Sequence, residues 1–410
     1  MNTKQDRPTI AIVYDHLTTT YGGAEVVLQS LHDLYPDAPL YTTVYEKSRL
    51  DWIKLWSIKT SFLQHLPSFF RRRHQWQALI APLAIETLDV SGFDIVISVS
   101  AGVAKGIVTN PRQLHVCYLL TPIRYLYESD VYTAHAFLRL PGIRWISERV
   151  FSYLRWWDRA AAFRPDRILA ISNLIAQRVK KYYGREVDAV IYPPFRLREN
   201  ADKATDGLST INIGTFDLII SRLVWYKRVD TAILASRTKG STLVIVGSGV
   251  DNHKLHKLAG KAGLIKATSE TLAAFLARAA LSNATILFCG ALSNSEAALL
   301  LSQCRSLLML GEEDYGMTAI EALAAGKPVV LSASSGAAEL LTDQKHCLAL
   351  KEVTPDSVLQ ALTTMETRAF PQALLKRKAL RYSDSVFQQY FAAEINRMWQ
   401  QQKERYDDNS

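Results

Sequence analysis

The chain has 410 residues, of which 48% are hydrophobic and 21% are charged. This balance is typical of a globular protein and excludes a largely disordered chain, a collagen and a coiled coil. Lys and Arg number 48 against 39 Asp and Glu, a net charge of +9, so we expect anionic partners: sugar nucleotides, anionic lipid or nucleic acid.

The cysteines are too few and too dispersed for a disulfide framework, and none lies at the CxxC spacing of a zinc site. The first apolar run follows Asp6 and Pro8, which favours a strand over a signal peptide. No apolar run reaches the about 20 residues that cross a bilayer. We therefore expect a cytoplasmic protein without a metal site, able to touch the inner face of the membrane.

Short β-branched runs alternate with helical patterns through the first half of the chain. The run 9–14 is followed by a glycine pair and a helical pattern over 23–35. Further apolar runs at 93–100, 115–120 and 166–172 predict buried strands. Their near-continuous apolar character is typical of a parallel sheet covered on both faces.

The same alternation starts again after residue 210, with strands predicted at 216–223, 241–247, 284–290, 306–311 and 327–333. Strand–helix alternation indicates parallel βαβ units. The intervening stretch 192–212 is polar, with two prolines and a glycine, and is interpreted as a linker. The fold class expected is therefore α/β, with two Rossmann-like doubly wound domains facing across a cleft where ligands bind.

We place the domains at 1–200 and 201–375, followed by a C-terminal region 376–410. That region contains a long amphipathic helical pattern over 381–406, which could cap the second domain or return to the first.

The most specific motif is GEEDYGMTAIEALAAGKPVVLS. Its segment MTAIEALAA consists of strong helix formers, so a helix is predicted to begin near Met317, directly after Gly316. A glycine and a proline end the helix. The N–H groups and positive dipole at its start suit a diphosphate. Glu321, about one turn in, could bind a ribose diol, and Glu313, on the preceding loop, a sugar hydroxyl. A surface helix with solvated acids is the alternative.

Two further motifs follow predicted strands. In SRLVWYKRVD, Arg222 and Lys227 could clamp a leaving diphosphate, with Arg228 as a competitor for either role and a plain basic loop as the alternative. In YDHLTTTYGGAE, Gly22 and Gly23 would let the backbone approach a ligand. Asp15 and His16 in the latter motif are candidates for acceptor contacts, and polar surface is their alternative.

These stretches together resemble a family 4 glycosyltransferase, a retaining enzyme of the GT-B fold. The resemblance covers nearly the whole chain and includes FDIVISVSAGVAKG, CYLLTPIRYLYE, RWWDRAAAFRPDRILAISNLIAQRVKKYY and VIYPPF besides the three motifs above. The subgroup it is most similar to transfers mannose or related sugars during cell-surface polysaccharide assembly.

The resemblance implies an acceptor-binding first domain, a nucleotide-sugar-binding second domain and a C-terminal helix that returns to the first. The implied catalytic residues are Arg222, Lys227 and Glu313. The implied donor-binding residues are Gly22, Gly23, Gly316, Met317, Thr318 and Glu321. Acceptor-side candidates are Asp15, His16 and Arg124.

The chain departs from the family at two positions. Leu120 stands where many relatives have a histidine of the active site, and Ala101 stands where a second histidine is usual. Leucine neither donates nor accepts a hydrogen bond. His115 is nearby in the sequence but is interpreted as structural.

The stretch Phe69–Trp76 is basic and aromatic and carries three arginines, which predicts contact with an anionic membrane. An ordinary helix with solvated arginines is at least equally compatible with it. No nucleic-acid-binding motif is found.

The function expected is transfer of a hexose, by guess mannose, from a nucleotide diphosphate sugar to a glycan or lipid-linked acceptor with retention of configuration. No cofactor is expected, and GDP is our guess for the donor nucleotide. The chain contains no Asp-x-Asp, which favours protein cations over a metal on the diphosphate. A non-catalytic sugar-nucleotide or glycan-binding subunit is the main alternative, motivated by Leu120 and Ala101. The second alternative is another enzyme on the same two-domain scaffold, either a sugar-nucleotide epimerase or a phosphorylase. A phosphorylase would need a lysine that holds its cofactor, and nothing in the sequence marks one.

Overall fold

The computed structural model describes residues 8–18, 22–47, 53, 56–67, 71, 77–128, 141–196, 213–341, 343 and 345–407. The chain divides into two compact units, of which the first combines Met1–Pro194 with Ser385–Ser410 and the second is Phe195–Asp384. The boundaries expected from the sequence were 200 and 376. The second unit extends to residue 384 because α16 (Gln372–Leu380) packs on α13 (Met317–Ala324) within that unit.

The first unit is built on a seven-stranded parallel sheet in the order β3-β2-β1-β4-β5-β6-β7. Its strands are β1 (Ile10–Tyr14), β2 (Leu40–Thr42), β3 (Ile58–Thr60), β4 (Ile95–Ser100), β5 (Leu114–Leu119), β6 (Arg167–Ala170) and β7 (Ala189–Val190). The central strands β1, β4 and β5 are buried almost throughout, as expected for a sheet with helices on both faces.

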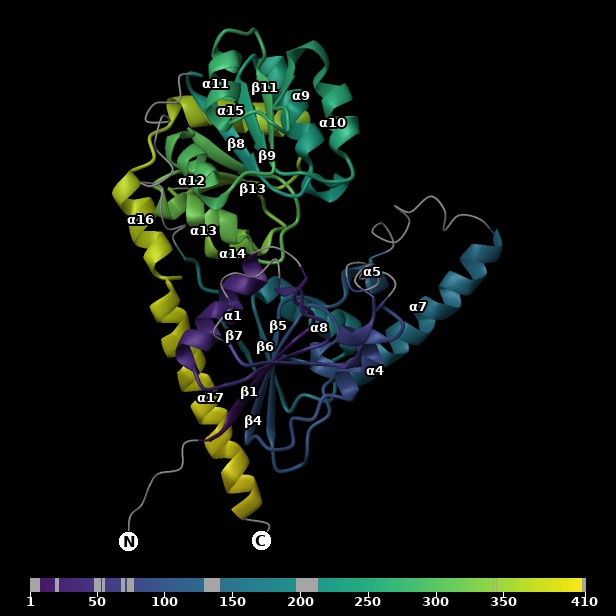
Figure 1. The fold of residues 1–410 in the computed structure, drawn as a ribbon. Coiled ribbons are helices and arrows are strands. Elements are labelled where there is room, and N and C mark those ends of the chain that lie inside the picture. The colour runs from purple at the N-terminus through teal and green to yellow at the C-terminus, as the bar shows by residue number, and fades with distance from the viewer. Residues whose placement is uncertain are drawn as a thin grey trace. The chain divides into compact units, whose positions relative to one another are not determined.

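Most strands of the first unit are followed in the chain by a helix, and one helix comes from the C-terminus (Figure 1). The helices are α1 (Gly23–Leu34), η3 (Phe62–His65), α4 (Ala81–Glu86), η4 (Ala104–Gly106), α5 (Arg124–Tyr127), α7 (Pro141–Ala161), α8 (Asn173–Tyr183) and the C-terminal α17 (Asp384–Asp407). The helix α8 begins at an N-cap, Ser172, whose side chain accepts the Ile175 N–H, and ends at Gly184 in the left-handed conformation.

The C-terminal helix α17 packs against the first unit. Phe391 meets the ring of Tyr118 on β5 edge-on, at 5.5 Å between ring centres. The amide of Gln388 donates to the Ser30 carbonyl on α1, and that of Gln402 donates to the Gln113 carbonyl just before β5. The predicted helix 381–406 thus corresponds to α17, which covers part of the N-terminal sheet.

The second unit is built on another seven-stranded parallel sheet, in the order β10-β11-β9-β8-β12-β13-β14. Its strands are β8 (Phe216–Ile220), β9 (Thr242–Val246), β10 (Gly263–Ile265), β11 (Ile286–Gly290), β12 (Ser306–Met309), β13 (Val329–Ser332) and β14 (Cys347–Leu350). Its helices are η6 (Trp225–Lys227), α9 (Val229–Lys239), α10 (Asn252–Ala259), η7 (Gly260–Ala262), α11 (Leu272–Ala280), α12 (Asn294–Gln303), α13, α14 (Gly336–Leu340), α15 (Pro355–Thr367) and α16.

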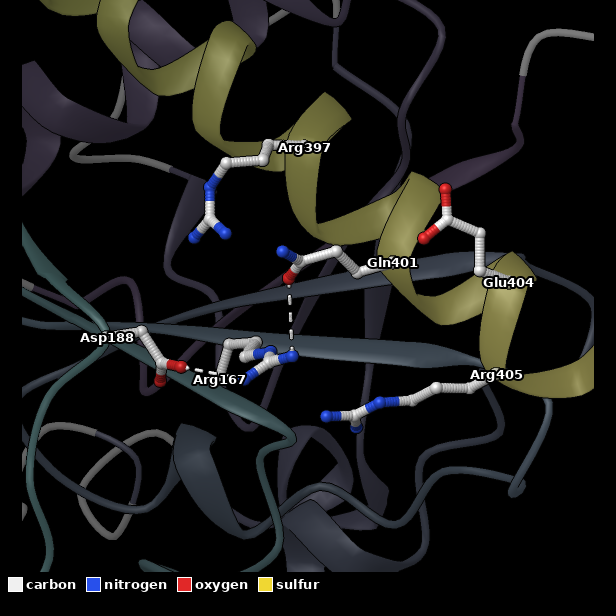
Figure 2. A pocket seen from close by; sticks show the side chains of 6 residues that line it. All are labelled: Arg167, Asp188, Arg397, Gln401, Glu404 and Arg405. Carbon is white, nitrogen blue, oxygen red and sulfur yellow. Dashed lines mark hydrogen bonds and ion pairs between the residues drawn. The ribbon is translucent and has the colours of Figure 1, made fainter.

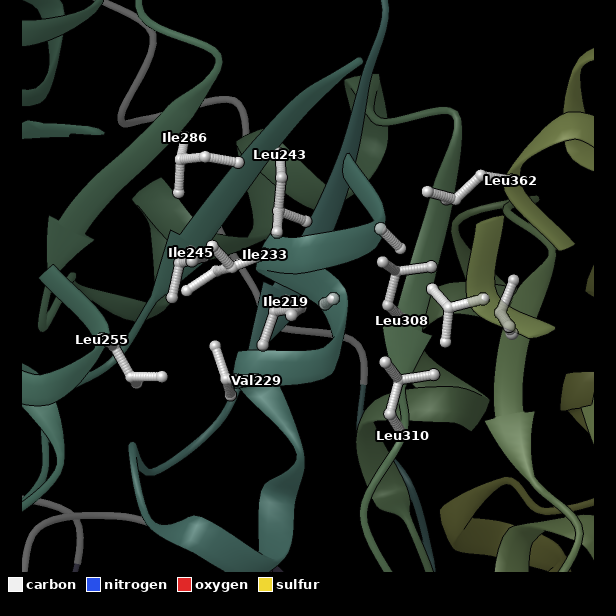
Figure 3. Packing of buried hydrophobic residues seen from close by; sticks show 14 of the residues in the cluster. Ile219, Val229, Ile233, Leu243, Ile245, Leu255, Ile286, Leu308, Leu310 and Leu362 are labelled. Carbon is white, nitrogen blue, oxygen red and sulfur yellow. The ribbon is translucent and has the colours of Figure 1, made fainter. Parts of the chain in front are cut away.

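One face of the second sheet carries a continuous hydrophobic core (Figure 3). Val229 and Ile233 of α9 and Leu362 of α15 pack there with Ile245 of β9 and Leu308 of β12. Burying such side chains contributes roughly 1.5–3 kcal/mol each to the stability of the fold. This core holds β8 and β12, the strands from which the candidate site extends, in a rigid position.

Both sheets reverse their winding direction at one point. In the first unit β1 is followed by β2 and β3 on one side, whereas β4 and the later strands lie on the other. In the second unit the same reversal lies between the neighbouring strands β8 and β12, with β9 to β11 on one side and β13 and β14 on the other. The loops after the two strands at such a switch point diverge and leave room for a ligand at the carboxyl edge of the sheet.

The prediction of two Rossmann-like doubly wound α/β domains is confirmed. Each predicted apolar run corresponds to a strand, whereas five short strands were not predicted. Of these, β3, β7, β10 and β14 lie at the sheet edges, and β2 is an inner strand of three residues. Edge positions are covered on fewer sides, so their sequences lack the long apolar runs of the central strands.

Candidate functional site

The motif SRLVWYKRVD lies in the loop after β8, at the switch point of the second sheet. Arg222 lies in the loop itself, and Lys227 ends the short helix η6. Arg228, which follows, has φ +55° and is the one non-glycine residue with positive φ in the described part of the chain. Its guanidinium donates to the Val353 carbonyl and to Thr231, so it holds the start of α9. The Arg228 guanidinium is thus engaged within the fold, and its role as a competitor for the diphosphate stays a prediction.

Tyr226 brings the two predicted cations together. The guanidinium of Arg222 donates to the Tyr226 hydroxyl at 3.1 Å. The ammonium of Lys227 lies 5.2 Å from the centre of the Tyr226 ring. Tyr226 was not predicted as a site residue, although it stands between the two cations in the motif.

Lys227 also pairs with Glu313, which belongs to the other loop of this switch point. The distance between Lys227 Nζ and Glu313 Oε1 is 2.5 Å, and the side chains are 10% and 23% exposed. The Glu313 carbonyl accepts the N–H of Gly336 at the start of α14, at 2.8 Å. Two residues 86 positions apart, predicted separately, are therefore joined at the carboxyl edge of the sheet.

Gly311 sets how closely the two loops approach. A Cβ at this position would lie 2.5 Å from the Tyr226 carbonyl oxygen and 2.7 Å from Lys227 Cα. Both distances are below any real contact of a Cβ, so only glycine permits this approach. The need for glycine at residue 311 was not recognised in the sequence.

The predicted phosphate-binding helix is α13, which begins at Met317 as expected. Gly316 precedes it with φ +88°, a conformation that favours glycine and that turns the loop into the helix. Gly316 has no side chain that could cap the first turn, where Met317 and Thr318 lie. Glu321 is half-buried one turn further along the same helix.

In the first unit, Asp15 lies at the carboxyl end of β1, where that sheet has its switch point. Its carboxylate accepts the N–H groups of Ala101 at 2.7 Å and Ala104 at 2.6 Å, and the Ser100 hydroxyl at 3.3 Å. Burial raises the pKa of Asp15, against these hydrogen bonds, which lower it. Asp15, predicted as an acceptor contact, is thus buried at 4% exposure and binds the loop after β4.

His16 and the glycine pair lie beyond the same strand. Burial lowers the pKa of His16 to about 4, so the imidazole is neutral at physiological pH. Gly22 is the N-cap of α1, and its N–H donates to the Glu25 carboxylate at 2.9 Å. Gly23 is the first residue of the helix. Glu25 therefore acts as a capping residue at the helix start.

Arg124, the third acceptor-side candidate, begins α5 and pairs with Glu128 one turn later, at 2.9 Å. Glu128 also lies 3.5 Å from the guanidinium of Arg178 on α8. Arg124 and Arg178 thus share the carboxylate of Glu128, the C-cap of α5.

The two positions at which the sequence departs from the family that it resembles, Ala101 and Leu120, directly follow β4 and β5. Leu120 directly follows β5 and is 9% exposed, and its N–H donates to the Ser100 carbonyl. His115 is fully buried within β5, where its Nε2 lies 2.8 Å from the Ser98 hydroxyl. Burial lowers the pKa of His115 to about 3, as expected for a structural histidine.

A buried ion pair near this edge was not predicted. Lys105 Nζ lies 2.5 Å from Asp158 Oδ1, with side chains 1% and 0% exposed. The same ammonium donates to the Gly102 carbonyl at 2.6 Å, and Asp158 Oδ2 accepts the hydroxyls of Tyr127 and Tyr183. The signal available in the sequence was a single lysine in the otherwise apolar segment AGVAKGIV and an aspartate that follows two tryptophans in WWDRAAAF.

An open pocket lies at the opposite, amino edge of the first sheet (Figure 2). It is lined by Arg167, Asp188, Arg397, Gln401, Glu404 and Arg405. Arg167 pairs with Asp188 at 3.0 Å. Arg397 pairs with Glu394 at 2.5 Å. Because neighbouring acids balance these charges, we do not assign an anion site to this pocket.

Among the described residues, no group of three or more His, Cys, Asp or Glu is placed to hold a metal ion. In the same part of the chain no helix has the length and apolar character needed to cross a membrane. The stretch Phe69–Trp76 lies, apart from Arg71, outside the described residues.

The comparison with protein families concerns the second unit. Residues 215–380 match the glycosyl transferases group 1. This range runs from β8 to α16 and includes both loops that carry the Lys227–Glu313 pair. No curated protein sequence matches the chain.

Solved structures resemble the chain over most of its length. HepE from Anabaena, determined in complex with UDP, is 15% identical with a TM-score of 0.63, covering 94% of this chain and 99% of that chain. Sucrose-phosphate synthase from Thermosynechococcus elongatus is 14% identical with a TM-score of 0.65, covering 96% and 99%. WaaG, a glycosyltransferase of lipopolysaccharide biosynthesis, is 15% identical with a TM-score of 0.60, covering 94% and 99%. The chain thus shares the two-domain GT-B fold of these proteins.

Proposed function

We propose that the chain is a glycosyltransferase that takes a sugar from a nucleotide diphosphate donor. The observation that carries the proposal is the Lys227–Glu313 pair at the switch point of the second sheet. It joins the two most specific motifs of the sequence, and both lie within the range that matches the glycosyl transferases group 1. A cation and a carboxylate at this edge suit a ligand with an anionic and a hydroxyl-bearing part.

In the proposed reaction, Lys227 and Arg222 bind the donor diphosphate. Both cations are at the carboxyl edge, and the start of α13 adds the N–H groups and positive dipole of a helix terminus. Charge develops on the diphosphate as the glycosidic bond breaks, and preorganised cations stabilise that charge. The diphosphate replaces Glu313 as the partner of Lys227, which releases Glu313 to bind hydroxyls of the transferred sugar.

The remaining donor contacts are proposed from the resemblance of the motifs alone. Glu321, one turn into α13, binds the ribose diol, and the backbone around Gly22 and Gly23 closes on the phosphate and acceptor. We propose front-face attack with retention of configuration, in which the departing phosphate oxygen takes the proton of the acceptor hydroxyl. This route needs no side-chain nucleophile.

The transferred sugar is proposed to be a hexose, with mannose as our guess, and the acceptor a glycan or a lipid-linked glycan. The donor nucleotide is open to direct test. GDP is the guess from the sequence, whereas HepE was determined with UDP and with UDP-glucose. Both nucleotides therefore belong in the experiment, with ADP as a third.

Thermal unfolding with each nucleotide tests the site. A ligand present at a hundred times its Kd adds about 2.7 kcal/mol to the free energy of unfolding. We expect one nucleotide to stabilise the protein and Glu321→Ala to abolish the shift, while Glu339→Ala on α14 keeps it. If no nucleotide raises the melting temperature, the proposed function is wrong.

The second candidate, a non-catalytic sugar-nucleotide-binding subunit, is favoured by Leu120 and Ala101, which leave apolar side chains where relatives have histidine. Nucleotide release from GDP-mannose and UDP-glucose, with acceptor or with water, separates it from the transferase. We expect release by the native protein and a loss in Leu120→His, since Leu120 is nearly buried in its present surroundings. A large gain in Leu120→His would instead indicate a degenerate site.

A further inference from the structure

The long helix α7 presents an outer face that the proposed function does not use. Trp145 is 58% exposed, Tyr153 46% and Trp156 66%, although aromatic side chains of this size are usually covered. The opposite side of the helix is buried through Leu154 and Trp157. The helix is thus amphipathic, but its solvent side is itself rich in aromatic residues.

These residues form one continuous stripe. Trp145, Arg149, Tyr153 and Trp156 are spaced by four, four and three residues, which places them on a single helical face. The Arg149 guanidinium lies 4.6 Å from the centre of the Trp145 ring, and Tyr153 stacks on Trp156 with 6.3 Å between ring centres. Phe163, just after the helix, is also 60% exposed.

The charge on this face is basic. Arg149 and Arg159 are exposed there, and Glu148 is the one exposed acid among the residues of α7 whose side chains are described. The second acid of the helix, Asp158, faces the interior and is neutralised by Lys105. The outer face therefore has an excess of positive charge next to its aromatic rings.

Tryptophan and tyrosine favour the boundary between lipid and water because an apolar ring carries a polar group. Arginine next to them adds attraction to anionic headgroups. A patch of exposed aromatic side chains on one helix of a protein marks an interaction site, whereas single exposed residues do not. Rings and cations on one straight face fit a flat anionic surface.

We propose that the outer face of α7 docks on an anionic membrane surface, with the helix lying in the plane of the interface. This surface is distinct from the stretch Phe69–Trp76, for which membrane contact was expected from the sequence. The proposal rests on the exposed face of the first unit and does not depend on the transferase activity.

Co-sedimentation with vesicles tests it on the full chain. We expect binding to vesicles of phosphatidylcholine with phosphatidylglycerol, and little binding to phosphatidylcholine alone. Replacement of Arg149 or Arg159 by Gln should weaken the partition about fivefold each. Trp145→Ser combined with Trp156→Ser should remove most of the binding. Added salt should weaken it, since the attraction is screened over about 8 Å at physiological ionic strength.

The matched control is Tyr390→Ser, which removes an equally exposed aromatic side chain, 66% exposed, from α17 of the same unit. It should bind like the native protein. Circular dichroism and the melting temperature without ligand verify that each variant is folded.

Three outcomes would overturn the proposal. The first is unchanged vesicle binding in the α7 variants. The second is loss of binding in Phe69→Ser with Phe70→Ser while the α7 variants still bind. The third is no vesicle binding by the native protein, and self-association that Trp156→Ser abolishes would then assign this face to a second copy of the chain.

Discussion

The two switch points of the molecule use polar residues in opposite ways. In the first unit Asp15, at the end of β1, binds the backbone of the loop after β4, and Lys105 in that region pairs with Asp158 in the interior. In the second unit Lys227 and Glu313 join the loops after β8 and β12 but stay in contact with solvent. The same topology thus supports a closed edge in one unit and an open edge in the other.

The two lysine–carboxylate pairs illustrate the difference, because both have an N–O distance of 2.5 Å. Neither partner of the buried pair can leave without stranding a charge in a medium of low dielectric constant. The partly exposed pair can exchange a partner for a ligand at much lower cost. The exposure of the side chains therefore distinguishes an ion pair that stabilises the fold from an ion pair that can exchange a partner for a substrate.

The largest effect on stability is expected for Lys105→Met. The substitution leaves Asp158 buried without its cation, which should lower the free energy of unfolding by about 3–5 kcal/mol. Urea denaturation measures the change. Lys239→Met, which breaks the pair with the 41% exposed Glu366, is the control and should change stability by about 0–1 kcal/mol. Equal losses in the two variants would contradict the distinction between buried and exposed pairs.

For Lys227→Ala we expect a large loss of turnover and little change in stability. Turnover should fall by about 10²–10³ because the developing charge on the diphosphate loses one cation. Stability should change by about 0–1 kcal/mol, as for a partly exposed pair. Steady-state release of the nucleotide and urea denaturation measure the two quantities, with Lys239→Ala as the control for both. Near-normal turnover would remove Lys227 from the proposed site.

A smaller effect is expected for Gly311→Ala. The added Cβ would contact the Tyr226 carbonyl and Lys227 Cα, so the two loops must separate. Overpacking of this kind destabilises by about 1–3 kcal/mol. We also expect weaker binding of the nucleotide in the thermal-shift titration, because the added Cβ displaces the backbone of Lys227. Gly92→Ala, where a Cβ would meet no atom within 4 Å, is the matched control and should leave binding unchanged. Unaltered nucleotide binding in Gly311→Ala would show that the close approach does not position Lys227.

The last prediction is a gradual dependence of stability on pH in the first unit. The folded pKa of His115 is about 3, below the unfolded value of 6.5, so its contribution is complete above pH 6.5 and is lost as the pH falls. The slope should be at most about 1.4 kcal/mol per pH unit between pH 6.5 and 4. Asp15, whose pKa is raised, acts in the opposite direction, so we compare variants rather than absolute stabilities.

His115→Gln should flatten the acid limb of the stability profile, measured by urea denaturation at a series of pH values. His253→Gln, on the exposed surface of α10, should retain the native slope. Parallel profiles for the native protein and His115→Gln would show that another group causes the loss.

Much of the fold could be predicted because the central strands of both sheets are buried on two faces. Runs such as 93–100 and 216–223 are apolar for that reason, and they correspond to β4 and β8. The edge strands β3 and β10, of three residues each, are too short and too exposed to leave such a run. The helix start at Met317 was also predictable, because Gly316, a run of strong helix formers and the terminating Gly-Lys-Pro follow one another directly in the chain.

The candidate site was predictable where its chemistry lies within one motif. Arg222 and Lys227 are five residues apart, and Gly316 and Glu321 belong to one helix, so each group was visible as a pattern. The contact of Lys227 with Glu313 and the close approach at Gly311 were not visible, because they join loops after strands far apart in sequence. The burial of Asp15 by the loop at Ala101 and Ala104 was hidden for the same reason.

By itself, the sequence determined the doubly wound architecture and the residue types at the carboxyl edges, because apolar periodicity and local motifs act over short stretches of chain. Only the tertiary structure decided which charged residues are neutralised inside and which remain open to a ligand. The reason is that exposure and ion pairing depend on neighbours brought together by strand order. Lys105 and Lys227 look alike in the sequence, and their surroundings alone give them different roles.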